Sequence, residues 1–293
     1  MKKNLYIILL SFIAIAVYAD NRQGIDFYKA GEPTIASWLF EKQLSSSPAE
    51  QAEALYYLGE IAFDENKTSE ALANYQKGWT TFPDYAYNKV GEGKVLLKTD
   101  KSTAQKAFDA AIKINKKDAS VYVAIAKAYS MNGMEAEAQA ALDNAKKYNA
   151  NDPAIYLYEG DLLISKDKPG DAAGRYEQAI HFDPACKEAY IKYANVYQGV
   201  TPTLSIGMLQ KVISNYPDYL PAYCHLGNIY SLQGNYPKAV AAYKTYMAGG
   251  LYSTDNLVHY ASALFFNKQY AESGKIISEG QAIDPDNFLL KRL

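Results

Sequence analysis

Histidine and cysteine are the side chains of this sequence best suited to catalysis or metal binding, and it contains three and two of them, respectively. His225 and His259 are 34 residues apart. In a fold that repeats at that interval they occupy one position of adjacent repeats, about 10 Å apart at a typical helix-packing distance. That is too far for two ligands of one metal ion, and no cysteine or carboxylate completes a ligand set. We expect two partly packed or solvated imidazoles and no metal site.

No sequence pattern predicts a catalytic constellation. The chain contains no Gly-x-Ser-x-Gly, His-Glu-x-x-His or P-loop motif. Gly91-Glu92-Gly93 lacks the third glycine of a nucleotide-binding fingerprint and follows a predicted helix, not a strand. His181 is expected late in a helix, where a cation is favourable, and the carboxylates are scattered singly along predicted helices. We therefore expect a protein that is not an enzyme and holds no cofactor.

Charge and length narrow the class of protein further. The formal net charge is −2 and no basic run is present, so the electrostatic pattern of a nucleic-acid binder is missing. The chain has 293 residues, which is too many for one compact core but suits a stacked array. No low-complexity segment or Pro/Gly/Ser-rich linker divides it, which favours one continuous architecture.

The N-terminus has the pattern of a secretory signal peptide. Met1-Lys2-Lys3 is a basic start, Leu5–Val17 is uncharged and mostly apolar, and Val17-Tyr18-Ala19 resembles a cleavage site. The apolar stretch is shorter than the roughly 20 residues of a membrane-spanning helix. We expect residues 1–19 to be removed and the protein to be exported to the periplasm or cell surface, with no membrane span in the mature chain; an uncleaved signal anchor is the alternative.

Small residues recur at a nearly constant interval along the chain and indicate internal repeats. The interval is 33 to 35 residues for Ala36, Ala71, Ala104, Ala138, Ala172, Ser205, Ala239 and Ser273. Four residues after each lies a large apolar one, namely Phe40, Tyr75, Phe108, Leu142, Tyr176, Leu209, Tyr243 and Ile277. A pairing of residues four apart that recurs in every repeat marks one buried helical face.

A second series of small residues precedes the first in each repeat. It consists of Gly24, Gly59, Gly91, Ala126, Gly160, Ala194, Gly227 and Ala261. Small residues on both helices of a pair allow the helices to approach closely, and aromatic residues at Tyr87, Tyr122, Tyr156, Tyr190 and Tyr223 fill the space between pairs. Repeats often close with proline, at Pro48, Pro83, Pro184, Pro217 and Pro285. A helix pair of this kind cannot bury its apolar face alone, so the pairs must stack.

These residues carry a resemblance to the tetratricopeptide-repeat (TPR) family. The segment from Leu226-Gly227 through Gly234-Asn235-Tyr236 to Ala239 and Tyr243 resembles the TPR signature almost position for position. The resemblance implies an all-α TPR solenoid, a right-handed superhelix of helix–turn–helix repeats, of the exported bacterial type. Its eight repeats are expected at about 20–51, 52–84, 85–118, 119–152, 153–186, 187–219, 220–253 and 254–287.

Three repeats and the C-terminus depart from the pattern. One extra residue between Gly91 and Ala104 predicts an irregular turn in the third repeat, and Gly199–Thr203 replaces the usual glycine turn in the sixth. Gly249-Gly250 stands where the seventh would close with proline. Residues 288–293 are expected to start a ninth, truncated helix. The last apolar face would then be uncapped, and self-association through it is possible.

The repeat positions also bear on the two cysteines. Cys186 lies at the junction before the sixth repeat, and Cys224 lies in the second turn of the first helix of the seventh. Their expected separation exceeds the roughly 7 Å between Cα atoms that a disulfide allows. We expect two free thiols.

In TPR proteins the first helix of each repeat lines the concave groove that binds a partner. The resemblance therefore implies a binding groove at Tyr56, Glu60, Phe63, Lys127, Asp161, Asn195, Gln198, Asn228 and Ser231. Further positions of the same face are Asn88, Glu92, Val123, Leu157, Ile164, Ile191, Cys224, Val258, Ser262 and Phe265. The Lys, Asn and Arg set with which chaperone-binding TPR domains hold an acidic C-terminal tail is not matched.

Asn195 and Asn228 occupy one groove position in adjacent repeats. Stacked amides offer a donor and an acceptor to the main chain of an extended peptide. Facing outward, they are expected to contribute to binding and not to stability; the alternative is that they are simply tolerated on a wet surface.

Two functions from different classes fit these observations. The first is a non-catalytic scaffold of the bacterial cell envelope that binds a peptide or protein partner, not nucleic acid, in its groove. The second is the ligand-binding solenoid of a longer sensory or catalytic protein whose C-terminal effector domain is missing.

Overall fold

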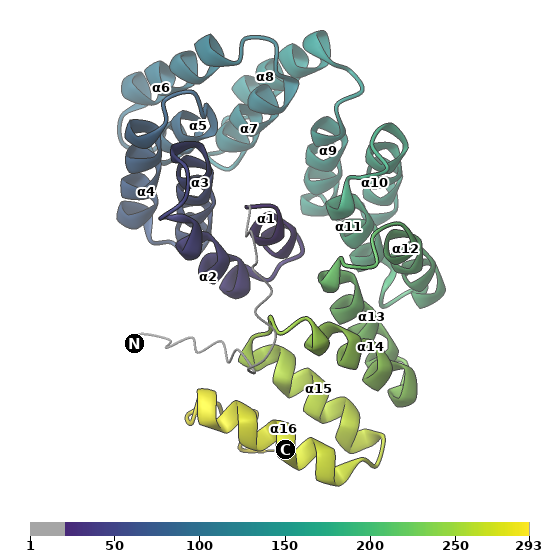
Figure 1. Ribbon diagram of the computed structural model, residues 1–293. Helices are drawn as coiled ribbons and strands as arrows, with labels where there is room; N and C mark the ends of the chain where they lie inside the picture. The colour runs from purple at the N-terminus through teal and green to yellow at the C-terminus, as the bar shows by residue number, and fades with distance from the viewer. Residues whose placement is uncertain (1–20, 293) are drawn as a thin grey trace. The chain divides into compact units, whose positions relative to one another are not determined.

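The computed structural model describes residues 21–292, and the only regular elements among them are helices (Figure 1). The sixteen helices are α1 (Asn21–Lys29), α2 (Pro33–Gln43), α3 (Pro48–Asp64), α4 (Thr68–Thr81), α5 (Tyr87–Leu96), α6 (Lys101–Ile114), α7 (Ala119–Ser130), α8 (Glu135–Tyr148), α9 (Pro153–Ser165), α10 (Pro169–Phe182), α11 (Lys187–Tyr197), α12 (Pro202–Asn215), α13 (Leu220–Leu232), α14 (Tyr236–Ala248), α15 (Thr254–Phe266) and α16 (Tyr270–Ile283). The all-α prediction is confirmed. The predicted signal peptide, residues 1–19, lies outside the described residues.

The described residues divide into two compact units. One contains residues 21–28 and 36–189, and the other contains residues 29–35 and 190–292. The second unit thus joins the C-terminal helices to a short segment from near the start of the chain.

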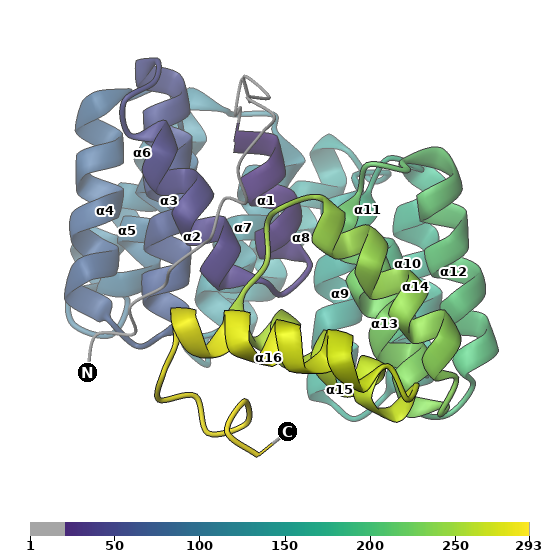
Figure 2. The same ribbon diagram turned by 60° about the horizontal axis from the view of Figure 1, so that its bottom comes forward.

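Helices pack as consecutive antiparallel pairs within each unit. In the first unit α3 packs on α4, α5 on α6, α7 on α8 and α9 on α10; in the second, α13 packs on α14 and α15 on α16. Both ribbon views show the last pair side by side (Figures 1 and 2). The first helices of neighbouring pairs also touch, as α3 with α5, α5 with α7 and α13 with α15. Within each unit, neighbouring pairs therefore bury apolar faces against one another, as stacked repeats require.

In the first, second, fifth and seventh repeats, the glycine of the first helix lies where the two helices of the pair approach closely. A Cβ atom on Gly59 would lie 2.4 Å from the Tyr75 ring, and one on Gly227 would lie 2.6 Å from the Tyr243 ring. Where the second helix carries serine, the hydroxyl donates to the first helix: Ser205 Oγ is 2.6 Å from the Ala194 carbonyl oxygen. The two series of small residues therefore face one another and bring the backbones together.

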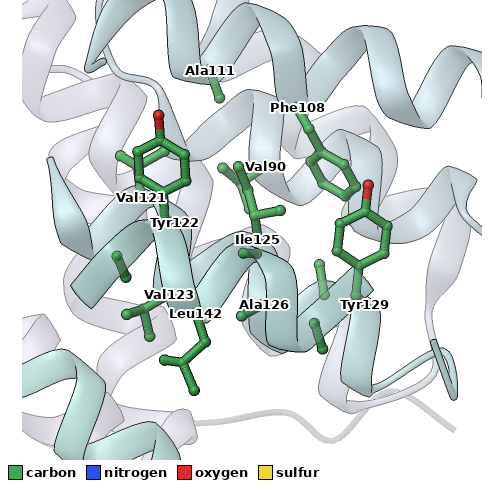
Figure 3. Packing of buried hydrophobic residues seen from close by; sticks show 14 of the residues in the cluster. Val90, Phe108, Ala111, Val121, Tyr122, Val123, Ile125, Ala126, Tyr129 and Leu142 are labelled. Atoms are coloured by element: carbon green, nitrogen blue, oxygen red, sulfur yellow. The ribbon is translucent and has the colours of Figure 1, made fainter. Parts of the chain in front are cut away.

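The third repeat uses a different glycine from the one expected. A Cβ on Gly93 would lie 2.4 Å from Phe108 of the same repeat, whereas Gly91 faces Tyr75 of the preceding repeat. The extra residue in this repeat shifts the contact along α5. Phe108 then meets the edge of Tyr129, with ring centroids 5.1 Å apart, in a core shared by α5, α6 and α7 (Figure 3).

Most of the turns inside the repeats share one backbone feature, a residue with positive φ. A residue with positive φ stands between the paired helices at Gly31, Asn66, Gly133, Asp167, Gly234 and Lys268. Between residues 21 and 292, the turn of the third repeat and that of the sixth contain no such residue. These are the two turns predicted to be irregular.

Pro48 opens a helix instead of closing a repeat. It is the first residue of α3, and the Ser47 side chain caps that helix in a reciprocal capping box with Glu50. Proline is favoured at this position because the N–H it lacks would have no partner there. Pro83, Pro184, Pro217 and Pro285 each follow the end of a helix, as predicted.

The C-terminal residues form turns where the start of a ninth helix is predicted. α16 ends at Ile283, and residues 285–286 and 288–292 are turns. The Asn287 side-chain oxygen accepts from the backbone N–H groups of Leu289 and Leu290, which competes with helical hydrogen bonding. Leu290 is 1% exposed and packs against Gly280 of α16.

Candidate partner-binding surface

Three of the predicted groove residues accept a hydrogen bond from a tyrosine of their own repeat. The Tyr75 hydroxyl donates to Glu60 Oε1 at 2.6 Å, Tyr176 to Asp161 Oδ1 at 3.0 Å, and Tyr243 to Asn228 Oδ1 at 2.6 Å. The two residues of each pair are 15 positions apart in the sequence. Burial raises the pKa of all three tyrosines, so each hydroxyl stays protonated and donates. The acceptors are thus oriented from within the repeat.

Glu60 and Phe63 are brought together by a lysine that the groove positions do not include. Lys94 Nζ lies 2.7 Å from Glu60 Oε1 and 4.2 Å from the centroid of the Phe63 ring. Lys94 is only 5% exposed, so its charge is paired away from water. The sequence carries a signal for this pair, because Lys94 follows Glu60 by one repeat length.

Tyr56 lies in a tyrosine cluster. Its ring centroid is 5.1 Å from that of Tyr57, 6.0 Å from that of Tyr85 and 5.5 Å from that of Tyr87. Burial raises the pKa of the Tyr56 hydroxyl well above its ordinary value. Tyr56 therefore helps to join α3 to the next repeat.

Lys127 and Asp161 meet across an open cleft between α7 and α9. Lys127 Nζ is 4.0 Å from Asp161 Oδ2, and the two side chains are 41% and 34% exposed. The cleft has a volume of about 400 Å³, and Met131, Tyr158 and Leu162 also line it. A cleft with an apolar wall and an exposed pair of opposite charges can hold both the side chains and the polar main chain of a peptide.

The two groove asparagines have different surroundings. Asn195 on α11 is exposed, whereas Asn228 on α13 is half-buried and bonded to Tyr243. The expectation that Asn228 does not contribute to stability assumed that its side chain makes no internal contact. That assumption is wrong, because the amide oxygen accepts a hydrogen bond from Tyr243. Gln198 and Ser231 are half-buried.

Asn88, a further position of the same face, is fully buried. Its Nδ2 donates to the carbonyl oxygen of Ala52 at 2.9 Å. It joins two adjacent first helices and offers nothing to a partner.

The side chains suited to chemistry do not assemble into a site among residues 21–292. No group of three or more His, Cys, Asp or Glu side chains there could hold a metal ion. Cys186 and Cys224 are free thiols, as predicted, and Cys224 is buried. No helix in the described part of the chain combines the length and hydropathy of a membrane span.

Comparison with protein families and solved structures identifies the repeat. Two family models described as tetratricopeptide repeat match residues 21–86 and 208–241. No curated protein matches the chain.

Several solved structures share the fold at low sequence identity. PilW, a type IV pilus biogenesis factor, is 17% identical over 71% of this chain and 97% of its own, with a TM-score of 0.54. PilF of Pseudomonas aeruginosa is 12% identical over 71% and 95%, with a TM-score of 0.53. Human IFIT1, solved as a dimer with m7Gppp-AAAA, is 14% identical over 92% and 69%, also with a TM-score of 0.53. At these identities the likeness concerns the fold.

Proposed function

Since the chain is a tetratricopeptide-repeat protein, an all-α solenoid that serves protein interaction, we propose that it is a non-catalytic scaffold of the bacterial cell envelope. A peptide or protein partner binds along the face formed by the first helices of its repeats. Export is supported by the basic start, apolar stretch and small residues of positions 1–19.

The observation that carries this proposal is the cleft between α7 and α9. Lys127 and Asp161 line it, are partly exposed, and bring a cation and a carboxylate to within 4.0 Å of each other. Tyr176 holds the Asp161 carboxylate in place through its hydroxyl at 3.0 Å. Met131, 54% exposed, offers an adaptable apolar surface beside them. Pre-oriented polar groups around an apolar wall are typical of peptide recognition sites.

Site-specific photo-crosslinking in cells tests the proposal. A photoreactive phenylalanine analogue at Met131 should give a discrete protein adduct in the envelope fraction. The matched control is the same analogue at Ala140, exposed on the second helix α8. Lys127→Glu should reduce the adduct from Met131, because it replaces one of the two lysines that line the cleft, Lys127 and Lys166, with an anion beside Asp161.

The results that count against the proposal are equally specific. Adducts from Ala140 but not from Met131 would place the partner on the other face. Recovery of the chain only from the cytoplasm would refute the envelope assignment.

A further inference from the structure

In the unit formed by residues 29–35 and 190–292, the turn Ala30–Gly31–Glu32 lies against α13 and α15. Glu32 Oε1 is 3.1 Å from Asn256 Nδ2 and 3.7 Å from Cys224 Sγ. The carbonyl oxygen of Ala30 is 3.1 Å from His225 Nε2. A carbonyl can only accept, so this imidazole nitrogen carries the proton. The turn therefore presents one carboxylate and one main-chain carbonyl to donors on first helices.

The direction of the Asn256 amide is fixed by its other hydrogen bonds. Its Oδ1 accepts from the Ser253 backbone N–H at 2.7 Å, as part of a capping box, and from the Tyr246 hydroxyl at 2.9 Å. The oxygen is thus engaged, and Nδ2 must point toward Glu32. Asn256 is 3% exposed and Cys224 is 2% exposed. A buried donor aimed in this way needs an acceptor opposite it, which the Glu32 carboxyl supplies, and the amide cannot turn its own oxygen outward.

The turn itself is shaped for this contact. Gly31 has φ 86°, a conformation that glycine adopts without strain, and no atom lies close to the position of a Cβ there. Ala30 is 6% exposed and Ile35 is fully buried, so both ends of the segment are anchored. The left-handed glycine places the Ala30 carbonyl and the Glu32 carboxylate on the same side. Burial raises the pKa of the Glu32 carboxyl, and the charge of Asp255 adds to this. The hydrogen bonds of Asn256 and Cys224 lower the pKa and so offset part of the cost of placing the carboxylate here.

We propose that the pocket formed by Cys224, His225 and Asn256 is a binding site for a Gly–Glu turn of a partner protein, and that the chain's own Ala30–Gly31–Glu32 turn fills it until the partner displaces it. This rests on the proposed interaction function and supplies the chemistry of one partner segment: a carboxylate that follows a left-handed glycine, with a free carbonyl before that glycine. The internal turn competes as an intramolecular ligand, whose effective concentration is set by its anchored ends. A partner must therefore bind more tightly than the turn alone.

Variants that exchange charge between Glu32 and Asn256 test their contact, with the alkylation rate of Cys224 as the measurement. All variants carry Cys186→Ser, so that Cys224 is the one thiol that reacts. In the unaltered pocket, alkylation of Cys224 by N-ethylmaleimide should be slow, because the thiol is buried and burial together with Glu32 raises its pKa. Glu32→Lys and Asn256→Asp should each speed alkylation at least about tenfold, the first by facing the Asn256 donor with a cation and the second by facing Glu32 with a carboxylate. The double variant should return to the slow rate, since the introduced ammonium and carboxylate attract.

Glu41→Lys is the matched control, because Glu41 is exposed on α2 and the same charge change occurs there away from the pocket. It should leave the rate unchanged. Circular dichroism must show the same helical signal for all variants. If Glu32→Lys fails to fold, Glu32→Gln should raise the rate by a smaller factor in the same direction.

Binding in trans completes the test. The probe is a fluorescein-labelled peptide with blocked ends and the sequence of residues 27–35, FYKAGEPTI. It should bind the Glu32→Lys chain at least about tenfold more tightly than the unaltered chain, and the same peptide with Gln for Glu should lose that gain. Asn256→Asp and the double variant should not bind it.

Three outcomes would overturn the proposal. These are a Glu32→Lys chain that keeps Cys224 slow, a double variant as reactive as the single ones, and a peptide affinity that Glu32→Lys does not change. Alkylation that slows as chain concentration rises would mean that a second copy supplies the turn, which overturns the intramolecular assignment. If one of these outcomes is found while photo-crosslinking from Met131 still gives an adduct, the assignment of this pocket is wrong and the proposed function is not affected.

Discussion

Gly160→Ala should destabilise the protein although alanine is the better helix former. Gly160 lies inside α9, where its Cα faces the ring of Tyr176. A Cβ atom there would be 2.4 Å from Tyr176 Cε1, closer than side-chain atoms normally come. Tyr176 is 2% exposed, and its hydroxyl is bonded to Asp161 at 3.0 Å, so the ring cannot move without losing packing and a hydrogen bond.

The net effect follows from three opposing contributions. Overpacking of a buried site costs about 1–3 kcal/mol. Weakening the tyrosine hydrogen bond adds about 0.5–1.5 kcal/mol. Alanine recovers about 1 kcal/mol through its helix propensity. We expect a net loss of about 0.5–3.5 kcal/mol in the free energy of unfolding.

Gly174→Ala is the control within the same repeat. Gly174 lies in the middle of α10, is exposed, and has no atom within 4 Å of the position that a Cβ would take. Only the propensity gain acts there, so this variant should be more stable by up to about 1 kcal/mol. Urea unfolding followed by circular dichroism at 222 nm measures both. If Gly160→Ala is as stable as Gly174→Ala, close helix approach is not the reason for glycine at Gly160.

Asn228→Ala should cost about 0.5–1.5 kcal/mol because Tyr243 loses its acceptor, whereas exposed Asn195→Ala should stay within about 0.5 kcal/mol; equal costs in urea unfolding would contradict this. Tyr243→Ala should cost about 3–5 kcal/mol, since its ring is 1% exposed and packs on Gly227, and a calorimetric loss below that range would show that the repeat collapses around the gap. Burial lowers the pKa of the His225 imidazole from its ordinary 6.5, so its neutral form is favoured in the folded state. The stability that this group contributes is fully present above about pH 6.5 and is lost as the pH falls through the lowered pKa. His225→Gln should therefore lose less stability over that pH range than the unaltered chain. An equal loss for both chains in urea unfolding would argue against this role of His225.

The helical fold could be predicted from the sequence because its evidence recurs. A single Ala71 and Tyr75 pair four residues apart would be weak, but the same pair in every repeat fixes which helical face is buried. Departures from the period were informative as well, since the irregular third turn accompanies the use of Gly93 in place of Gly91. The helix start at Pro48 was misplaced because proline after a helix and proline opening one look alike until the capping serine is considered.

The candidate surface was less predictable, because a repeat position defines a face and not the contacts made there. Position counting places Glu60, Asp161 and Asn228 in the groove, and it does not show that a tyrosine of the second helix holds each of them. The signal was nevertheless present: in these three repeats an acceptor precedes the tyrosine by 15 residues. The contact of Glu32 with Asn256 spans 224 residues and follows no period, so sequence reasoning had no means to find it.

The tyrosine-bonded acceptors suggest how one position can serve both folding and recognition. A carboxylate has two oxygens with about four acceptor sites, so Asp161 can accept from Tyr176 and also pair with Lys127. An amide has one acceptor oxygen and one donor group. At Asn228 the Tyr243 hydroxyl takes one of the two lone pairs of the amide oxygen, so the side chain keeps its N–H₂ donor and one acceptor site. A carboxylate can only accept, so the Asp161 position should favour partner donors, whereas the Asn228 amide can meet either a donor or an acceptor of a partner. Glu60 differs from both, because Lys94 pairs with its carboxylate away from water.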